Sequence, residues 1–566
     1  MSAAKMTKSI SITRMLLAPM LALVLGAAAH AAVPGITGPT FNLTAQMSFL
    51  NQPDGNAIYS WGYGCNGTPS GFVPAPIAGA TCPTMQVPGP TLVVTENQTV
   101  TVTLTNNLPS PAGNTSILFP GFVVTAAAAA TQPVGCSAPG APAPTGVLTT
   151  EAANGCAVTY TFVASSPGTH SYYSGTQGDL QVEMGLYGAV VVLPATVPTV
   201  CTTGLAAANV SVKSSWGEAD YRLSQAAYDH PKSCYDREYL FQWAEMDPRI
   251  HDTALAQVTA LGTCTAGTPA CSLNVPTEPY HPAYFIINGR SMPDLMDANY
   301  APEYPHQPYN GNPHMHPGEL TLIRTIGQGR WQHPFHEHAN HVRILARDGN
   351  MILSANDSST TPSLAGQLMF NTDTTPGEAF DGIFYFTGRG LNWDAYGHHP
   401  GDSADPLASL PCYPDANGYY TVNSTPPAPV HAVNYYEWCQ DHNKPLEVAP
   451  NGDVASGGPA TLPDPNIFTN GPWYGGTPYL GPDATLRAGG TQACASTAGS
   501  VALNASSTCS TLLPSNIQAN PASERGWAYM WHSHNEREIT TNNVFPGGML
   551  MMMLVDTREF VIDESN

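Results

Sequence analysis

The chain has 566 residues, of which 11% are charged, and it contains 52 glycines and 53 prolines. Its formal net charge of −22 at pH 7 argues against nucleic acid or an anionic membrane surface as a partner. Abundant glycine and proline, with valine, threonine and tyrosine in short runs between turn residues, favour an all-β protein.

The first 31 residues have the features of a secretory signal peptide. Lys5, Lys8 and Arg14 precede an apolar run, and Ala29-His30-Ala31 forms an A-x-A cleavage site. The run is too short to span a bilayer, and no later stretch approaches the roughly 20 apolar residues that a membrane helix needs. We therefore expect cleavage near Ala31 and a mature chain that is periplasmic or otherwise secreted, without membrane insertion.

All 12 cysteines lie after this segment, and an even number in a secreted chain favours structural disulfides. Connectivity does not follow from sequence alone, but pairs of near neighbours would each close a short loop. These pairs are Cys65–Cys82, Cys136–Cys156, Cys264–Cys271 and Cys494–Cys509.

The runs that favour β-strands fall into two blocks. The first block, about 32–195, has the runs Thr91–Thr95, Thr99–Leu104 and Tyr187–Leu193, which suit one β-sandwich. We interpret 196–229 as a linker.

The second block, 230–566, begins with the apolar run Glu238–Trp243 and closes with Trp527–Trp531 and the strand that follows Gly548. Between about 388 and 524 lies a stretch rich in glycine, proline, asparagine and serine that contains four of the cysteines. We interpret this stretch as a loop-rich insertion in the second domain.

Two H-x-H steps in the second block predict a histidine cluster. His336 and His338 form one step, and His532 and His534 form the other. Alternate side chains of an extended strand point the same way, so each step can present two imidazoles on one face. Imidazole nitrogens suit copper, with zinc as the alternative. The structural alternative is a set of hydrogen-bonded histidines in a core without metal, which is less favourable because buried nitrogens would need other partners.

Short motifs in a fixed order identify a resemblance. They are Val87-Pro88-Gly89-Pro90-Thr91, Asn106-Asn107-Leu108, Asn288-Gly289, Pro317-Gly318-Glu319 and Asp348-Gly349. Together with the H-x-H steps, they resemble the multicopper oxidase family of cupredoxin-fold proteins across most of the mature length. The resemblance implies tandem cupredoxin-like Greek-key β-sandwiches with long loops.

The family holds three copper ions between two domains with eight histidines, and this chain matches only half of them. His336, His338, His532 and His534 match the ligands of the second domain. In the first domain, Leu118 and Pro120 replace one expected pair, and Tyr173 and Gly175 replace the other. The resemblance therefore implies fewer copper ions than in a full multicopper oxidase.

The family's blue copper centre is also incomplete. His333 matches one of its ligands, but Ser533 stands in place of the cysteine and Glu538 in place of the second histidine. Without a thiolate, rapid one-electron transfer to copper loses its main donor. We consider His333, Glu538 and Met549 as additional ligands or supporting residues, although packing in a β-sandwich core is the favoured role for Met549.

Three further histidine positions remain open. His341 lies three residues beyond His338 and is a candidate supporting partner of the cluster. His314 and His316 form another H-x-H step in a loop rich in proline and glycine, where a solvated loop is favoured over an accessory copper site. The sequence does not show whether His170 compensates for the lost first-domain ligands.

Three functions follow from these observations. We favour a secreted copper-binding protein with altered or residual oxidoreductase activity and without ordinary four-copper laccase activity. The alternatives are a metal-binding module without turnover and a disulfide-braced structural or assembly scaffold. Metal ions are the expected partners, and the sequence leaves open whether the chain forms a homo-oligomer.

Overall fold

The computed structural model describes residues 32–142, 147–203, 218–316, 319–386, 477–479, 493–496, 499–502, 526–556 and 562–564. The predicted signal peptide and most of the predicted insertion lie outside these ranges. In the described part of the chain, no helix is long and apolar enough to cross a membrane.

Two five-stranded sheets form the first sandwich. One sheet has the order β4 (Phe72–Val73), β1 (Gly35–Thr37), β5 (Leu92–Thr95), β10 (Tyr187–Leu193), β9 (Gly168–Tyr173). The other has the order β3 (Ala57–Cys65), β2 (Thr40–Asn51), β6 (Thr99–Asn106), β8 (Ala157–Val163), β7 (Thr125–Ala128). In β6 the apolar side chains Val100, Val102 and Leu104 are buried in the shared core, and the intervening threonines are more exposed. This period of two is what a half-buried strand requires.

Two larger sheets form the second sandwich. The first has the order β12 (Tyr284–Ile287), β11 (Arg237–Met246), β14 (Leu320–Gly327), β20 (Ala379–Tyr385), β16 (Val342–Arg347), β17 (Asn350–Met351), and β18 (Leu368–Met369) pairs with β16. The second has the order β13 (His314–Met315), β25 (Leu550–Asp556), β24 (Gly526–Ser533), β15 (His333–Glu337), β19 (Asn371–Thr374), and β21 (Thr477–Tyr479) pairs with β24. A separate hairpin joins β22 (Ala493–Ser496) to β23 (Gly499–Ala502).

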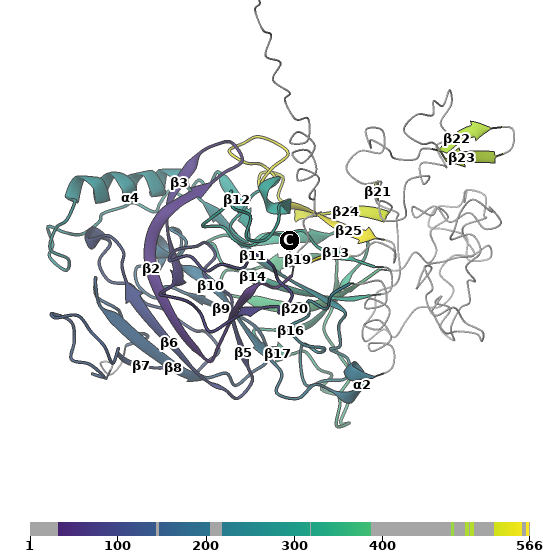
Figure 1. The fold of residues 1–566 in the computed structure, drawn as a ribbon, viewed down its shortest axis with the longest axis horizontal. Helices are drawn as coiled ribbons and strands as arrows, with labels where there is room; N and C mark the ends of the chain where they lie inside the picture. The colour runs from purple at the N-terminus through teal and green to yellow at the C-terminus, as the bar shows by residue number, and fades with distance from the viewer. Residues whose placement is uncertain are drawn as a thin grey trace, which may run out of the picture.

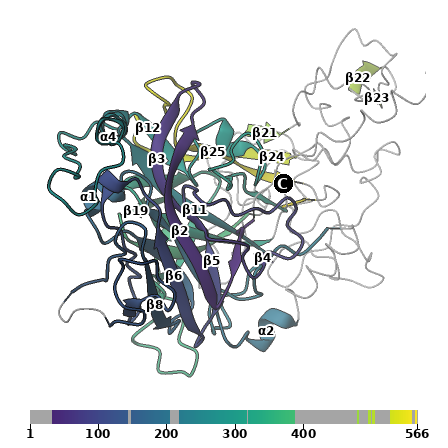
Figure 2. The same ribbon diagram turned by 60° about the vertical axis from the view of Figure 1, so that its left-hand side comes forward.

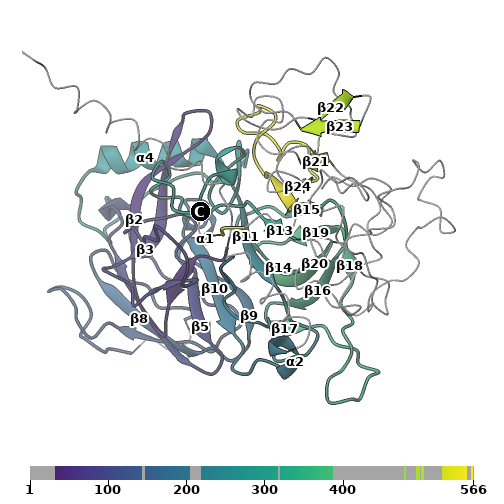
Figure 3. The same cartoon turned by 45° about the vertical axis from the view of Figure 1, so that its right-hand side comes forward.

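The two sandwiches pack side by side, the first purple to blue and the second teal to yellow (Figure 3). Val93 and Val191 from the first sandwich share an apolar cluster with Leu240 and Ile326 from the second. This contact explains why β10 is apolar along most of its length, since its sheet is covered on both faces. The all-β expectation of tandem sandwiches is confirmed.

Among the described residues, one helix of 14 residues stands beside several single-turn helices. They are α1 (Gly178–Gln181), α2 (Thr199–Thr202), α4 (Pro248–Leu261), η2 (Ser110–Ala112) and η3 (Asp294–Met296). Helix α4 begins after Asp247, whose side chain accepts a hydrogen bond from the amide of Arg249 at 3.1 Å.

Helix α4 follows β11 of the second sandwich but lies beside β3 of the first (Figures 1 and 2). Its buried residues Ile250 and Ala254 belong to the first core. The chain thus returns to the first sandwich before it forms β12. The boundaries at 195 and 230 stay predictions.

Three of the four predicted disulfides are confirmed: Cys65–Cys82, Cys136–Cys156 and Cys264–Cys271. The fourth predicted pair lies outside the described side chains. A further disulfide, Cys201–Cys234, joins α2 to the segment before β11 across 33 positions of sequence. The preference for near neighbours did not predict this longer link.

Candidate metal centre

The two H-x-H steps lie on adjacent strands of the second sandwich, as predicted. Strand β15 pairs antiparallel with β24, and His336 stands directly opposite His532. His338 follows the end of β15, and His534 follows the end of β24. Antiparallel pairing and the period of two along each strand therefore bring the four imidazoles from two distant parts of the sequence to one face of the strand pair.

Three of these imidazoles converge most closely. His336, His338 and His532 each offer a ring nitrogen, and the three nitrogens all lie within 4.8 Å of one another. The Nε2 atoms of His338 and His532 are 3.2 Å apart. The ring of His534 lies 5.0 Å from that of His336, and its side chain is exposed. His534 therefore stands at the rim of the cluster.

Backbone carbonyls orient two of the rings. The carbonyl of Phe370 accepts a hydrogen bond from Nδ1 of His336 at 2.6 Å, and the carbonyl of Ser533 accepts one from Nδ1 of His532 at 2.7 Å. Because a carbonyl only accepts, Nδ1 carries the hydrogen and Nε2 keeps its lone pair. A carbonyl on the second ring nitrogen is the usual support of a metal-binding histidine. The donor set fits a copper or zinc ion.

The three converging imidazoles, those of His336, His338 and His532, favour their neutral form. Burial is the largest cause of a lowered pKa at His336, His338 and His532, and neighbouring imidazoles lower it further. The pKa of His338 falls to about 4. Neutral rings at pH 7 are the form that binds metal, so little proton competition opposes an ion here.

His341 does not join the cluster directly. Its ring packs edge-on against Phe370, with 5.3 Å between ring centroids, and Phe370 in turn packs against His336. Phe370 thus contacts both His341 and His336. Its role as a supporting partner stays a prediction.

An ion triad includes His333 and Glu538, two of the residues that the resemblance matches to the blue copper centre. Nδ1 of His333 lies 2.8 Å from Oε2 of Glu538, and Nε2 lies 2.9 Å from Oε2 of Glu245. Ser533 donates its hydroxyl to the same Glu538 oxygen at 2.5 Å. Both nitrogens of His333 thus face carboxylates, and neither faces an open coordination position. Met549 is fully buried in the apolar core, as favoured from the sequence.

Sequence reasoning missed Glu245. It lies on β11, a strand whose ten residues are all buried. A charged residue inside the apolar run Glu238–Met246 was the available signal, because a buried carboxylate requires a partner. No motif of the family resemblance includes this position.

The residues that replace the first-domain histidines also lie together. Leu118 and Tyr173 are bridged, with the amide of Leu118 donating to the carbonyl of Tyr173 at 2.7 Å. Leu118, Pro120 and Tyr173 line a mainly apolar hollow of about 420 Å³. Gly175 packs closely against Leu118 and leaves no room for a side chain. His170 is directed to the carbonyl of Ser166 at 3.1 Å, so these contacts do not place it among the missing ligands.

The expectation of a solvated loop at His314 and His316 was wrong. Both side chains are buried, because β13 pairs with the end of β25. Nδ1 of His314 lies 2.6 Å from Asp556, and Nε2 of His316 lies 2.9 Å from Glu218.

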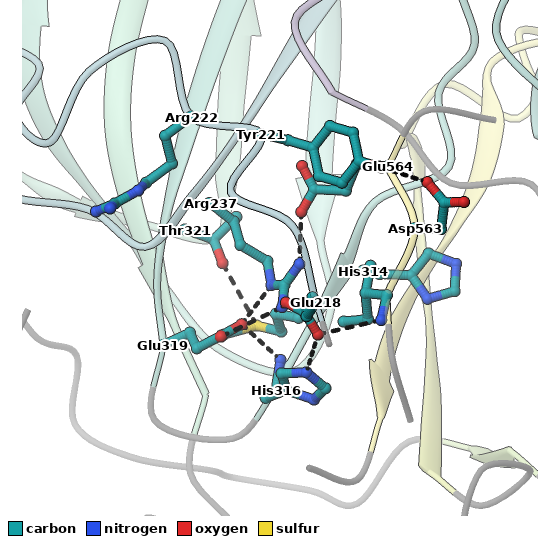
Figure 4. A network of polar contacts seen from close by, with 12 residues as sticks. Glu218, Tyr221, Arg222, Arg237, His314, His316, Glu319, Thr321, Asp563 and Glu564 are labelled. Carbon is teal, nitrogen blue, oxygen red and sulfur yellow. Dashed lines mark hydrogen bonds and ion pairs between the residues drawn. The ribbon is translucent and has the colours of Figure 1, made fainter. Parts of the chain in front are cut away.

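Arg237 stands at the centre of the same network and forms ion pairs with Glu218, Glu319 and Glu564 (Figure 4). His316, Glu218 and Glu319 also bring three potential ligand atoms within 4.8 Å. The guanidinium already engages both carboxylates, so the contacts describe a structural ion network.

Comparisons with known proteins point to one family. Residues 80–196 match the sequence profile of the multicopper oxidase family. No curated protein sequence matches the chain.

Similar solved structures are copper proteins at low identity. The blue copper oxidase from Nitrosomonas europaea is 13% identical, covers 91% of this chain and 85% of its own, and has a TM-score of 0.41. The copper nitrite reductase from the same organism is 18% identical. The match covers 62% of this chain and 86% of that protein, with a TM-score of 0.34. The laccase from Botrytis aclada is 17% identical. The match covers 63% of this chain and 47% of that protein, with a TM-score of 0.34.

Proposed function

We propose that this chain belongs to the multicopper oxidase family, whose profile matches residues 80–196, and that it is a copper-binding protein with redox activity different from that of a four-copper laccase. The observation that carries the proposal is the convergence of His336, His338 and His532, with ring nitrogens within 4.8 Å. Two of these rings have a carbonyl on Nδ1, which leaves Nε2 for a metal.

The chain's own residues set what such a centre can do. A bound copper ion would supply one-electron redox chemistry on this half-buried face of the strand pair. His336 and His532 would hold it through Nε2, while Phe370 and Ser533 fix the ring orientations. The ion triad at His333 offers no second copper position, so four electrons cannot be collected as in a laccase. Weak oxygen reduction to water follows.

We also propose that the mature chain works outside the cytoplasm. The basic and apolar segment before Ala31 supports export, and four disulfides among the described residues suit an oxidising compartment. The amino-terminal sequence of the exported protein tests this directly. A mature chain that still begins at Met1 would contradict the proposal.

Copper titration tests the metal site. Wild type, His338→Ala/His532→Ala and the control His281→Ala are titrated with copper by calorimetry after chelator treatment. His281 is exposed and lies outside the cluster, so its removal tests for binding at surface histidines. We expect binding by wild type and the control and a large loss in the double variant. Equal binding by all three proteins would remove the proposed site.

The same ion triad also supports the non-catalytic alternative. A protein without a copper ion that accepts electrons from a substrate can bind and store metal without catalysing oxidation. Oxygen uptake by the copper-loaded protein, with a phenol or a reduced metal ion as electron donor, separates the two functions. Turnover above that of the double variant supports an oxidase. Copper binding without turnover supports a metal-binding module.

A further inference from the structure

The triad around His333 joins three separate parts of the second sandwich. His333 lies on β15, Glu245 lies on β11, and Glu538 lies in the loop after β24. All three side chains are at most 1% exposed. Because solvent is excluded, the charges of this cluster must be compensated within the cluster, and its polar atoms must find hydrogen-bond partners there.

The hydrogen bonds determine where the proton resides. Oε2 of Glu538 also accepts from the hydroxyl of Ser533, and its Oε1 accepts from the side-chain amide of Asn535 at 2.8 Å. Oε1 of Glu245 accepts from the backbone amides of Arg330 and Trp331 at 2.7 and 2.9 Å. Each carboxylate therefore receives at least one hydrogen bond from an N–H group that can only donate, namely the side-chain amide of Asn535 for Glu538 and two backbone amides for Glu245, and these bonds favour the ionised form.

Two ionised carboxylates require two N–H groups on His333. A neutral imidazole has one N–H and one lone pair, so one of its contacts would set a lone pair against a carboxylate oxygen. At 2.8 and 2.9 Å that arrangement is repulsive, whereas an imidazolium donates to both partners. These contacts therefore require the protonated form of His333, which carries one more proton than a neutral imidazole.

The remaining groups around the triad do not supply a competing charge. Trp243 packs over His333 with 6.3 Å between ring centroids. The guanidinium of Arg330 is directed to Glu278 at 2.7 Å and stacks over Tyr280. The guanidinium of Arg537 is directed to the carbonyl of Pro282 at 3.1 Å.

Tyr280 connects the triad to a second buried carboxylate. Its hydroxyl lies 3.3 Å from Oε1 of Glu245 and donates to Oε2 of Glu183 at 2.7 Å. Glu183 lies in the first sandwich, in the segment that follows α1. Burial is the main cause of its raised pKa. A carboxylate with a raised pKa is a suitable proton acceptor.

We propose that the position of the blue copper centre is a buried proton site, in which His333 holds a proton between Glu245 and Glu538 and exchanges it through Tyr280. In the transfer the Nε2–H bond of His333 breaks as an O–H bond forms on Oε2 of Glu245. Rotation of this carboxyl group brings the new O–H towards Tyr280, whose oxygen accepts the proton as its own hydroxyl proton passes to Oε2 of Glu183. No electron is transferred, and the total number of protons is unchanged. The site does not depend on copper at the histidine cluster.

Nitrogen NMR of the full mature protein with ¹⁵N-labelled histidine tests the proton site. We expect both ring nitrogens of His333 to carry hydrogen at pH 7, with assignment from the loss of signals in His333→Gln. Glu245→Gln and Glu538→Gln should each lower the pH at which a nitrogen loses its proton. Glu278→Gln, an exposed carboxylate near the triad, is the control and should leave it unchanged.

If His333→Gln does not fold, the signal that moves in both glutamate variants and not in the control provides the assignment. A His333 ring with a single N–H at pH 7 in wild type would overturn the proposal. Added zinc should shift the signals of the histidine cluster and leave His333 unchanged. Failure of the proposed metal site and failure of the proton site are therefore read from different signals.

The rate at which the ring protons of His333 exchange with water tests the proposed path through Tyr280. Tyr280→Phe should slow this exchange at least about tenfold, because the hydroxyl between Glu245 and Glu183 is removed. Tyr304→Phe is a matched control, since Tyr304 also stacks with an arginine and donates to a carboxylate, Asp297, at 2.7 Å. Equal exchange in both variants would exclude Tyr280 from the path.

Discussion

At the scale of single residues, Ser533 in place of the cysteine expected from the resemblance is only part of the difference from a blue copper centre. Glu538 and Glu245 hold both nitrogens of His333, so restoring a thiolate leaves the imidazole unavailable. We expect no intense thiolate-to-copper absorption in copper-loaded wild type or in Ser533→Cys. An absorption spectrum of each protein checks this, and a strong blue band in either would contradict the assignment.

The triple variant Ser533→Cys/Glu538→His/Glu245→Gln should behave differently. It supplies a thiolate and a second imidazole and removes the carboxylate that holds Nε2 of His333. We expect an intense visible band only when all three changes are present. The double variant that retains Glu245 is the control, because it isolates the contribution of this one residue.

The charge on His333 predicts a pH-dependent stability. Burial lowers its pKa, but hydrogen bonds and charges from Glu245 and Glu538 raise it from 6.5 to about 9. Because the folded pKa is raised, the stabilisation is complete below pH 6.5 and is lost as the pH rises through 9. A shift of this size corresponds to roughly 3 kcal/mol.

Denaturant unfolding of wild type and His333→Gln from pH 6 to 10 measures this effect. The difference in unfolding free energy between the two proteins should be constant near pH 6 and shrink towards pH 10. A difference that does not change with pH would mean that His333 is neutral in the folded protein.

At the scale of elements, the two strands β15 and β24 explain how much each histidine should contribute to metal binding. His338 and His532 have Nε2 atoms 3.2 Å apart, whereas His534 is exposed beyond the end of β24. His338→Ala should weaken copper binding by more than the roughly 10–100-fold loss typical of changes around a metal site. His534→Ala should have a smaller effect. Calorimetry with both single variants compares the two losses of copper affinity. A larger loss in His534→Ala than in His338→Ala would contradict the position of His534 at the rim of the cluster.

Patterns within single strands were the part of this fold that the sequence could predict. The run Thr99–Leu104 predicted a strand, which the structure has as β6 (Thr99–Asn106), and the spacing of His336 from His338 and of His532 from His534 predicted residues that share one face. Both signals depend only on the period of two along an extended chain.

Contacts between distant elements could not be predicted in this way. Glu245 reaches His333 only because β11 lies in the sheet that faces β15, and α4 packs on the first core although it follows β11 in sequence. Likewise, the proline-rich surroundings of His314 indicated a loop, but pairing with β25 buries it. Tertiary packing overrode the local signal in each case.

At the scale of the whole molecule, Arg237 ties together segments that are far apart in sequence. Its guanidinium pairs with Glu218 before β11, with Glu319 at the start of β14 and with Glu564 near the carboxyl end (Figure 4). Its side chain is 1% exposed, and the three carboxylates are at most 4% exposed. A buried network of this kind is costly to break, because removing one partner leaves the others as uncompensated charges.

Arg237→Met should therefore lower the free energy of unfolding by about 3–5 kcal/mol. Arg237→Lys should recover part of the loss, since an ammonium keeps the charge but cannot donate to three carboxylates with the geometry of a planar fork. Arg249→Met is the matched control, because Arg249 also pairs with a buried carboxylate, Asp247, while its own side chain is 55% exposed. The Asp247 carboxylate that this control leaves behind still accepts hydrogen bonds from the backbone amides of Arg249 and His281, so its effect should be far smaller. Denaturant midpoints of the three variants provide the measurement. A loss in Arg237→Met no larger than that in Arg249→Met would show that the carboxyl-terminal segment is held by its apolar contacts and not by this network.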